Sequence, residues 1–210
     1  MLVAILSILT FVSAILTIFA AYQKRRLTLY LFKPLTILFV ILIALQPKYS
    51  TSFFYRYAII AGLLLSLVGD IFLMLPSDRF VSGLVSFLFA HVCYTFAFIY
   101  ESERDLSFWH LIPFLLYGCL MLRVLWPHLG RMRLPVVIYM LVILMMGWTA
   151  TSRHLLTQQG GSLLALIGAI LFIASDSVLA LDRFKGHFRS AQFLILSTYF
   201  TAQWLIALST

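Results

Sequence analysis

The sequence predicts an all-α integral membrane protein, a polytopic bundle of eight transmembrane helices. Composition is the first observation: 63% of the 210 residues are hydrophobic and only 10% are charged, whereas a soluble domain carries about 25% charged residues. The second is that the apolar residues form eight runs that approach the length needed to cross a bilayer. The third is that the connections are short. We therefore expect residues 1–210 to form a single transmembrane domain.

The first four helices are expected at Leu2–Tyr22, Tyr30–Leu45, Tyr57–Leu75 and Phe80–Tyr100. Charge or proline interrupts each run at its end. The basic residues 24–26 follow the first run, Gln46-Pro47-Lys48 the second and Pro76-Ser77-Asp78 the third, and the charged segment Glu101–Asp105 follows the fourth. Because no positive segment precedes the first run, we interpret it as a membrane helix and not as a cleavable signal peptide.

The last four helices are expected at Phe108–Leu125, Leu134–Thr151, Gly161–Leu181 and Ala191–Leu208. Three short segments separate these runs, and each contains proline, glycine or charge. The segments are Trp126–Arg133, Gln158–Gly161 and Asp182–Ser190.

Basic residues lie mainly in or beside alternate loops. The formal net charge of +8 sits at helix ends, which suits topology and lipid phosphates, so we expect no nucleic-acid partner. The first, third, fifth and seventh loops and their borders hold eleven of the fifteen Lys and Arg residues. The other four are Lys48, Arg56, Arg104 and Arg153. The positive-inside rule then predicts extracytoplasmic termini in a bacterial inner membrane or an endoplasmic reticulum-type membrane.

Two aspartates, Asp70 and Asp176, lie inside apolar runs. An ionisable residue there is costly and is a functional candidate by default. Each lies about five residues before the end of its helix, roughly 7–8 Å inside the same membrane boundary. Two carboxylates in a pocket of low dielectric are expected to titrate apart, so that one keeps its proton while the other stays ionised. Such a pair suits general acid–base chemistry.

The surroundings of the two aspartates echo each other. In both, aliphatic residues follow the intramembrane aspartate and lead to Asp-Arg-Phe, at residues 78–80 and 182–184. We interpret this as a 4+4 internal duplication with half-repeats 1–105 and 106–210, which would place Asp70 and Asp176 at equal depth. Chance in an alphabet poor in polar letters is the other explanation.

Further polar residues are expected on the same half of the bundle. Helical spacing puts Ser66 on the face of Asp70, and Tyr94 on that of His91. A lysine at a helix end can snorkel to the headgroups, and a lone histidine can simply join two helices. Because only His91 is deep in the bundle, a three-histidine zinc site is not expected. The supporting candidates are Lys33, Ser66, His91, Tyr94, Tyr139, Ser175, Tyr199 and Gln203.

Five motifs in this order resemble the YhhN-like membrane family, whose characterised members are lysoplasmalogenases. They are Lys33-Pro34-Leu35-Thr36, Ser66-Leu-Val-Gly-Asp70, the run Phe80–Tyr94, Ser175-Asp176-Ser-Val-Leu-Ala and Tyr199-Phe-Thr-Ala-Gln203. The resemblance covers nearly the whole chain. It implies an eight-helix architecture and a hydrolase that cleaves the vinyl ether bond of a lysoplasmalogen to a fatty aldehyde and a glycerophospho-headgroup.

The chemistry that this resemblance implies suits the predicted pocket. Protonation of a vinyl ether gives an oxocarbenium ion, as in glycosidases, where one carboxylic acid donates a proton and a carboxylate stabilises the cation or activates water. We expect Asp70 and Asp176 to be this catalytic pair. His91, Tyr94 and Tyr199 would orient water or the ether oxygen, and Lys33 would hold a carboxylate ionised or meet the lipid phosphate. Neither a cofactor nor a metal is needed, and the lipid would enter from the cytoplasmic leaflet.

Two other interpretations of the paired aspartates stay open. An intramembrane aspartyl protease carries Gly-x-Gly-Asp, but Leu67 stands at the first glycine position here and the second motif is Ser175-Asp176. A multi-pass transporter or proton-coupled carrier needs helices broken near the midplane. The prolines Pro34, Pro113 and Pro135 are instead expected near helix starts. The oligomeric state is not indicated.

Overall fold

A computed structural model describes residues 1–46, 48–102 and 106–210. The predicted loop residue Pro47 and the charged segment 103–105, with Arg104, lie outside the described residues. Within the described part of the chain, eight helices are long and apolar enough to cross a membrane, and no residue there forms a β-strand. The predicted fold class, an all-α integral membrane bundle, is confirmed.

The helices are close to the predicted runs. Their bounds are α1 Leu2–Tyr22, α2 Arg26–Ala44, α3 Phe53–Met74, α4 Phe80–Glu101, α5 Ile112–Leu125, α6 Arg133–Thr157, α7 Gly160–Ala180 and α8 Ala191–Leu208. A 3₁₀ turn at Phe108–Leu111 precedes α5, and a π-helical turn at Leu181–Lys185 extends α7. The predicted bounds of the first and last helices, Leu2–Tyr22 and Ala191–Leu208, agree with those of α1 and α8.

Three helices extend beyond their apolar runs. The α2 helix begins at Arg26, so Pro34 lies inside it and not near its start as predicted. The α3 helix begins at Phe53, where the Ser52 side chain accepts a hydrogen bond from the Tyr55 amide. The prediction that Arg153 lies in a loop is wrong, because α6 continues to Thr157 and buries it. Hydropathy ends a helix at its first charge, whereas the backbone hydrogen bonds continue past it.

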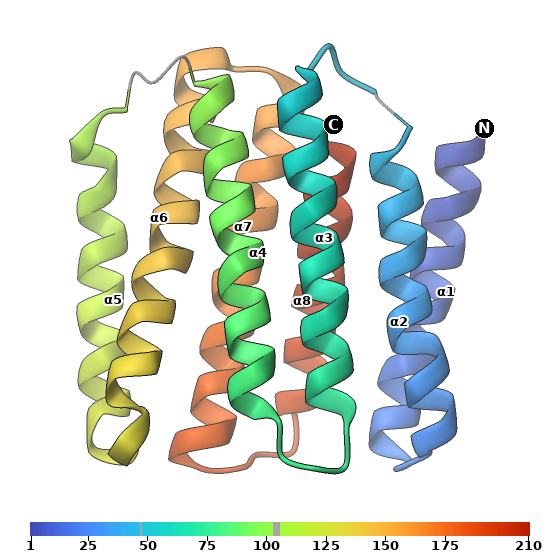
Figure 1. The fold of residues 1–210 in the computed structure, drawn as a ribbon, viewed down its shortest axis with the longest axis vertical. Coiled ribbons are helices and arrows are strands. Elements are labelled where there is room, and N and C mark those ends of the chain that lie inside the picture. Colours follow the sequence, from blue (N-terminus) through green and yellow to red (C-terminus); the bar gives the residue numbers. More distant parts are fainter. Residues whose placement is uncertain (47, 103–105) are drawn as a thin grey trace.

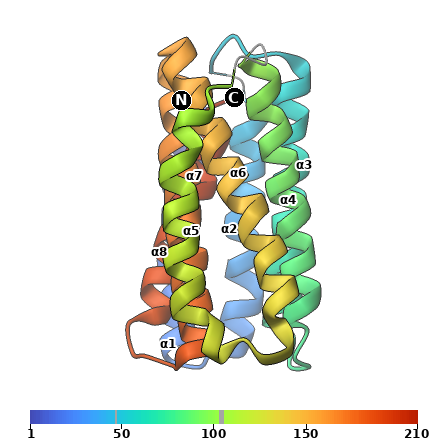
Figure 2. The same ribbon diagram turned by 90° about the vertical axis from the view of Figure 1, so that its left-hand side faces the viewer.

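The helices stand side by side with their axes along one direction (Figure 1). Both termini lie at one end, and the α3–α4 and α7–α8 loops lie at the other. The closest packing is between α3 and α4, between α7 and α8, and between α1 and α2. The α5 helix stands at the edge of the bundle and packs mainly on α6 (Figure 2). The division into half-repeats 1–105 and 106–210 of a single domain stays a prediction.

Glycines allow the site helices to approach each other closely, as expected for membrane bundles. A Cβ atom at Gly69 of α3 would lie only 2.7 Å from Cε2 of Phe87 on α4. A Cβ atom at Gly168 of α7 would lie 2.9 Å from the carbonyl oxygen of Ala202 on α8. These contacts bring α3 against α4 and α7 against α8, which are the helices around the two aspartates.

Candidate active site

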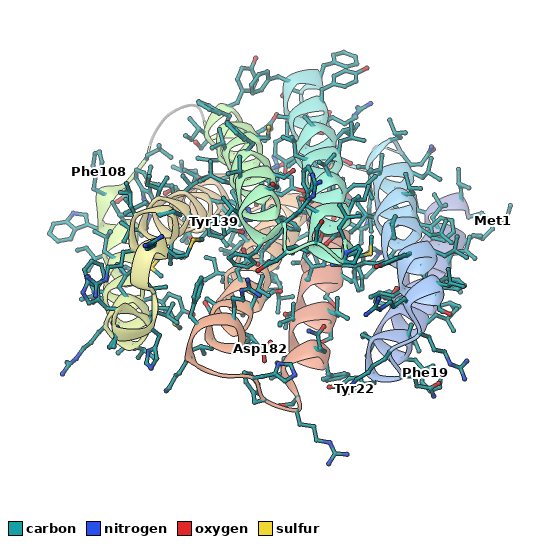
Figure 3. All side chains as sticks on the ribbon, turned by 60° about the horizontal axis from the view of Figure 1, so that its bottom comes forward. Met1, Phe19, Tyr22, Phe108, Tyr139 and Asp182 are labelled. Carbon is teal, nitrogen blue, oxygen red and sulfur yellow. The ribbon has the colours of Figure 1, made fainter. Side chains whose placement is uncertain are left out.

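A cavity of about 410 Å³ lies at the end of the bundle opposite the termini, within the size range of small-molecule sites. Figure 3 brings this end forward, with Asp182 on the segment after α7. Both predicted catalytic residues, Asp70 from α3 and Asp176 from α7, line the cavity. The structure therefore brings together two carboxylates that are more than a hundred residues apart in the sequence.

Asp70 is buried against a cation. Lys33 Nζ from α2 lies 3.0 Å from Asp70 Oδ1, and the Tyr199 hydroxyl from α8 donates a hydrogen bond of 2.7 Å to Asp70 Oδ2. Asp70 is only 1% exposed and Lys33 only 9%, so each buried charge needs the other. Because both neighbours donate to the carboxylate, these contacts favour its ionised form.

Asp176 has different partners. The Tyr139 hydroxyl from α6 donates to Asp176 Oδ2, and His91 Nε2 from α4 lies 2.9 Å from that hydroxyl oxygen and 3.4 Å from Oδ2. Since the tyrosine proton goes to the carboxylate, the imidazole is the donor toward Tyr139. Among the described residues, no lysine or arginine lies within ion-pair distance of Asp176. The two aspartates thus differ in exposure and in the charge of their partners: the side chain of Asp176 is 15% exposed and that of Asp70 only 2%.

Aromatic rings pack against one another beside the two aspartates. Phe87 lies edge-on to Phe172, with ring centroids 6.2 Å apart, and edge-on to Tyr199 at 5.8 Å. The His91 imidazole packs edge-on to Phe172 at 4.5 Å. Of these rings, Phe87 and Tyr199 line the cavity itself, together with aliphatic residues such as Leu196, so part of the lining offers apolar contact to hydrocarbon.

Charged residues from two loops form the mouth of the cavity. The Arg183 guanidinium donates to Asp78 Oδ2 at 2.5 Å, and this bond, with the neighbouring positive charge, holds the pKa of the Asp78 carboxyl below its usual range. Phe80 packs edge-on to Phe184 at 5.8 Å. The two copies of Asp-Arg-Phe that echo each other in the sequence thus contact each other. Arg79 also lines the cavity.

Sequence reasoning assigned these mouth residues to topology and missed them as site residues. His187, expected to be solvated, has an exposed side chain, yet its Nδ1 lies 2.8 Å from Asp182 Oδ1 and it lines the cavity. The signal that could have found them was the Asp-Arg-Phe echo, because each copy directly follows a helix that carries an intramembrane aspartate.

The supporting candidates fall into two groups. Lys33, Ser175 and Tyr199 line the cavity, although the Ser175 hydroxyl is used by the Ile195 carbonyl oxygen at 3.0 Å. Tyr94 and Gln203 do not line it; they pair with each other, with the Tyr94 hydroxyl 2.8 Å from Gln203 Oε1. Ser66, on α3 one turn before Asp70, is fully buried and also lies outside the lining.

Within the described ranges, no group of three or more His, Cys, Asp or Glu side chains could hold a metal ion. The contacts around the aspartates are instead those of a proton-transfer site: carboxylates, phenols and an imidazole in hydrogen-bond reach of one another.

Comparisons with known proteins show which protein family this chain is similar to. The YhhN family model matches residues 28–210. The uncharacterized membrane protein YhhN of Escherichia coli O157:H7 is 31% identical over 199 residues, 94% of this chain and 94% of that protein. Lysoplasmalogenase TMEM86A of Bos taurus is 36% identical over 156 residues, 72% of this chain and 64% of that protein. Lysoplasmalogenase TMEM86B of Homo sapiens is 37% identical over 170 residues, 76% and 66% of the two chains. No solved structure matches.

Proposed function

The chain belongs to the YhhN family, and from this premise we propose that it is a lysoplasmalogenase-like membrane hydrolase. It cleaves the vinyl ether bond of a lysoplasmalogen taken from the bilayer and releases a fatty aldehyde and a glycerophospho-headgroup. Relatives named lysoplasmalogenase support the hydrolase class. The observation that carries the proposal is that two aspartates with different partners line one cavity at one end of the helix bundle.

Asp176 is the proton donor in this proposal. It contacts a phenol and an imidazole and no lysine or arginine within the described residues, whereas Asp70 has Lys33 as its counter-ion, so we assign the proton to Asp176 and the negative charge to Asp70. The acid protonates the alkene carbon remote from the ether oxygen, and the electron pair of the double bond forms the new C–H bond. The oxocarbenium ion that results is stabilised by a nearby carboxylate.

Asp70 is that carboxylate. Lys33 and Tyr199 both donate to it, which keeps it ionised while the cation forms. Water adds to the carbon bonded to oxygen and loses a proton to a carboxylate. The hemiacetal then collapses to the aldehyde and the alcohol of the headgroup. In this scheme Lys33 tunes a carboxylate and is not available to the lipid phosphate.

The rim of the cavity supplies cations for the phosphate. Arg79 and Arg183 line the mouth beside the loops after α3 and α7. A guanidinium can donate two parallel hydrogen bonds to a phosphate, and Arg183 would do so with its donors that Asp78 does not use. A lipid held there has its headgroup at the membrane boundary and its vinyl ether deeper, toward the aspartates. This order of groups, from water to hydrocarbon, is the order of a lysoplasmalogen in a leaflet.

We also propose that the cavity opens to the cytoplasm and that both termini are extracytoplasmic. The cavity lies at the end that carries the basic-rich loops. Arg153 and Lys33 are both buried, which removes one basic residue from each side and leaves three against ten. Under the positive-inside rule the basic end is cytoplasmic. A reporter fused to the C-terminus that reads cytoplasmic contradicts this orientation.

Purified protein incubated with a lysoplasmalogen tests the function, with aldehyde followed by mass spectrometry. The wild type is expected to release aldehyde, and Asp70→Asn and Asp176→Asn are expected to release little. A carrier binds the lipid without producing aldehyde, so absence of product from the wild type removes the hydrolase assignment. Full activity in both variants contradicts the catalytic roles of the two aspartates but leaves the assignment of the substrate in place.

A further inference from the structure

An apolar groove of about 450 Å³ runs between α5 and α7 on the outer side of the bundle. Pro113, Phe114 and Tyr117 form its α5 wall, and Leu166, Ile170 and Ile173 form its α7 wall. The α7 residues are four and three positions apart, so they share one helix face. The space exists because α5 packs mainly on α6 at the edge of the bundle (Figure 2).

Shared lining residues relate the groove to the cavity that Asp70 and Asp176 line. A smaller cavity of about 50 Å³ follows the groove, and Tyr117 and Ile173 line both. Tyr139 and Asp176 line the smaller cavity as well. Asp176 also lines the cavity of about 410 Å³ that contains Asp70. From Leu166 to Asp176 the path follows α7 for ten residues, about 15 Å. The groove, the smaller cavity and the proposed acid therefore follow one another along α7, with lining residues shared between neighbours.

A hydrogen bond joins a residue of the groove to a residue of the smaller cavity. The Ser177 hydroxyl donates to the Ile173 carbonyl oxygen at 2.7 Å, so in the 2.6 Å contact between Tyr117 Oη and Ser177 Oγ the tyrosine is the donor. This bond ties α5 to α7 one residue from Asp176. It holds the two walls of the groove together beside the acid.

We propose that this groove holds the hydrocarbon chain of the lipid substrate. The inference rests on the proposed function and deepens it. In a vinyl ether the protonated carbon is itself part of the chain, so the chain must begin at the proton donor, Asp176, and leave it through apolar space. The mouth at Arg79 and Arg183 is charged and suits the headgroup. The space between α5 and α7 is an apolar continuation on the other side of Asp176, and it is larger than the apolar cavity of about 50 Å³ beside Phe87 and Phe184.

A matched pair of substitutions tests the groove. Ile170 of the groove is 49% exposed, and Ile138 of α6, which lines neither the groove nor the smaller cavity, is 45% exposed. Aldehyde release is measured with lysoplasmalogens of long and short alkenyl chain. In Ile170→Trp, kcat/KM for the long chain is expected to fall about tenfold, as when two or more methylene groups lose an apolar site. The short chain and the Ile138→Trp variant are expected to change less than about twofold.

A lysophospholipid with a photoreactive group at the end of its chain gives a readout without catalysis. Labelling is expected at Leu166 and Ile170 and is expected to fall when unlabelled lysoplasmalogen is added. Labelling that unlabelled lysoplasmalogen does not reduce comes from bulk lipid only, and this result overturns the groove proposal. Equal kinetics of Ile170→Trp and Ile138→Trp overturn it also, with the hydrolase intact. A wild type that releases no aldehyde from any chain length overturns the proposed function, and the groove's role with it.

Discussion

Each end of the bundle buries a cationic side chain, and the two side chains have different partners. At the cavity end, Lys33 pairs with the carboxylate of Asp70. At the end near the termini, Arg153 is 1% exposed and its Nη1 donates to the Tyr55 hydroxyl at 2.8 Å, with the guanidinium carbon 4.2 Å from the ring centroid. The Tyr55 hydroxyl in turn lies 2.6 Å from Ser209 Oγ.

The difference shows that a buried charge in a membrane bundle does not by itself mark a reaction site. The Arg153 group lines none of the cavities described above, and it joins α6, α3 and the residue after α8, so it acts as a brace. A guanidinium keeps its proton under all ordinary conditions and can stack on an aromatic ring. The Lys33 group contains a carboxylate that faces a cavity, so this group can exchange a proton with a molecule bound there.

Removing the two cations separates a reaction site from a brace. In Lys33→Met the carboxylate of Asp70 is left buried without its cation and is expected to become neutral. Loss of a correctly ionised acid–base partner lowers kcat by about 10²-fold or more. The measurement is the rate of aldehyde release per folded molecule, with folding checked by elution from a sizing column. An activity within a few fold of wild type contradicts the role of Lys33.

Arg153→Met is expected to act on stability instead. It removes a buried hydrogen bond and a cation–π contact from the brace, at a cost of about 1–3 kcal/mol. Thermal unfolding in detergent should therefore begin at a lower temperature, while kcat/KM at a temperature where the variant is folded stays near the wild-type value. If the variant unfolds like the wild type but loses activity, the assignment of this cluster as a brace is wrong.

A tyrosine hydroxyl in each region gives a smaller and matched contrast. Tyr139→Phe removes the donor to Asp176 and its link to His91, so kcat is expected to fall about tenfold, the effect of losing one hydrogen bond of about 1.4 kcal/mol at a reacting group. Tyr55→Phe removes a hydroxyl from the brace and should lower the unfolding temperature with little change in kcat. Equal kinetic effects from the two substitutions would show that the hydroxyl of Tyr139 has no special role.

The smallest effect is expected at the mouth, where Asp78 and Arg183 form an exposed ion pair. The pKa of Asp78 is lowered by this partner, so the stability from the pair is present above the ordinary aspartate pKa of about 3.9 and is lost as pH falls through the lowered pKa. Unfolding temperatures of wild type and Asp78→Asn should differ slightly at neutral pH and converge in acid. A difference that grows in acid contradicts the sign of this shift.

Much of the fold followed from the sequence because lipid imposes strict lengths on apolar runs. The aspartates were found for the same reason: a carboxylate in an apolar run is a strong signal. The pairing of Lys33 with Asp70, and of Tyr139 with Asp176, depends on which helices are neighbours, and spacing along one helix says nothing about that. Arg153 was misplaced because hydropathy treats a buried arginine as a loop residue.

The groove between α5 and α7 could not be predicted, because leucine and isoleucine occupy lipid-facing and cavity-facing positions alike. The mouth residues were visible only as a repeated Asp-Arg-Phe, whose two copies pair through Arg183 and Asp78. Residue types could be predicted from the sequence, whereas their neighbours required the packed helices.

Hydrolysis in heavy water tests whether Asp176 protonates a carbon of the substrate. Wild-type protein is incubated with a lysoplasmalogen in heavy water, and the aldehyde is analysed at early times, before exchange in solution. We expect a single deuterium on the carbon next to the carbonyl, and little aldehyde from Asp176→Asn in parallel. Aldehyde without deuterium at that carbon, or an equal yield of labelled aldehyde from the variant, would show that Asp176 is not the proton donor.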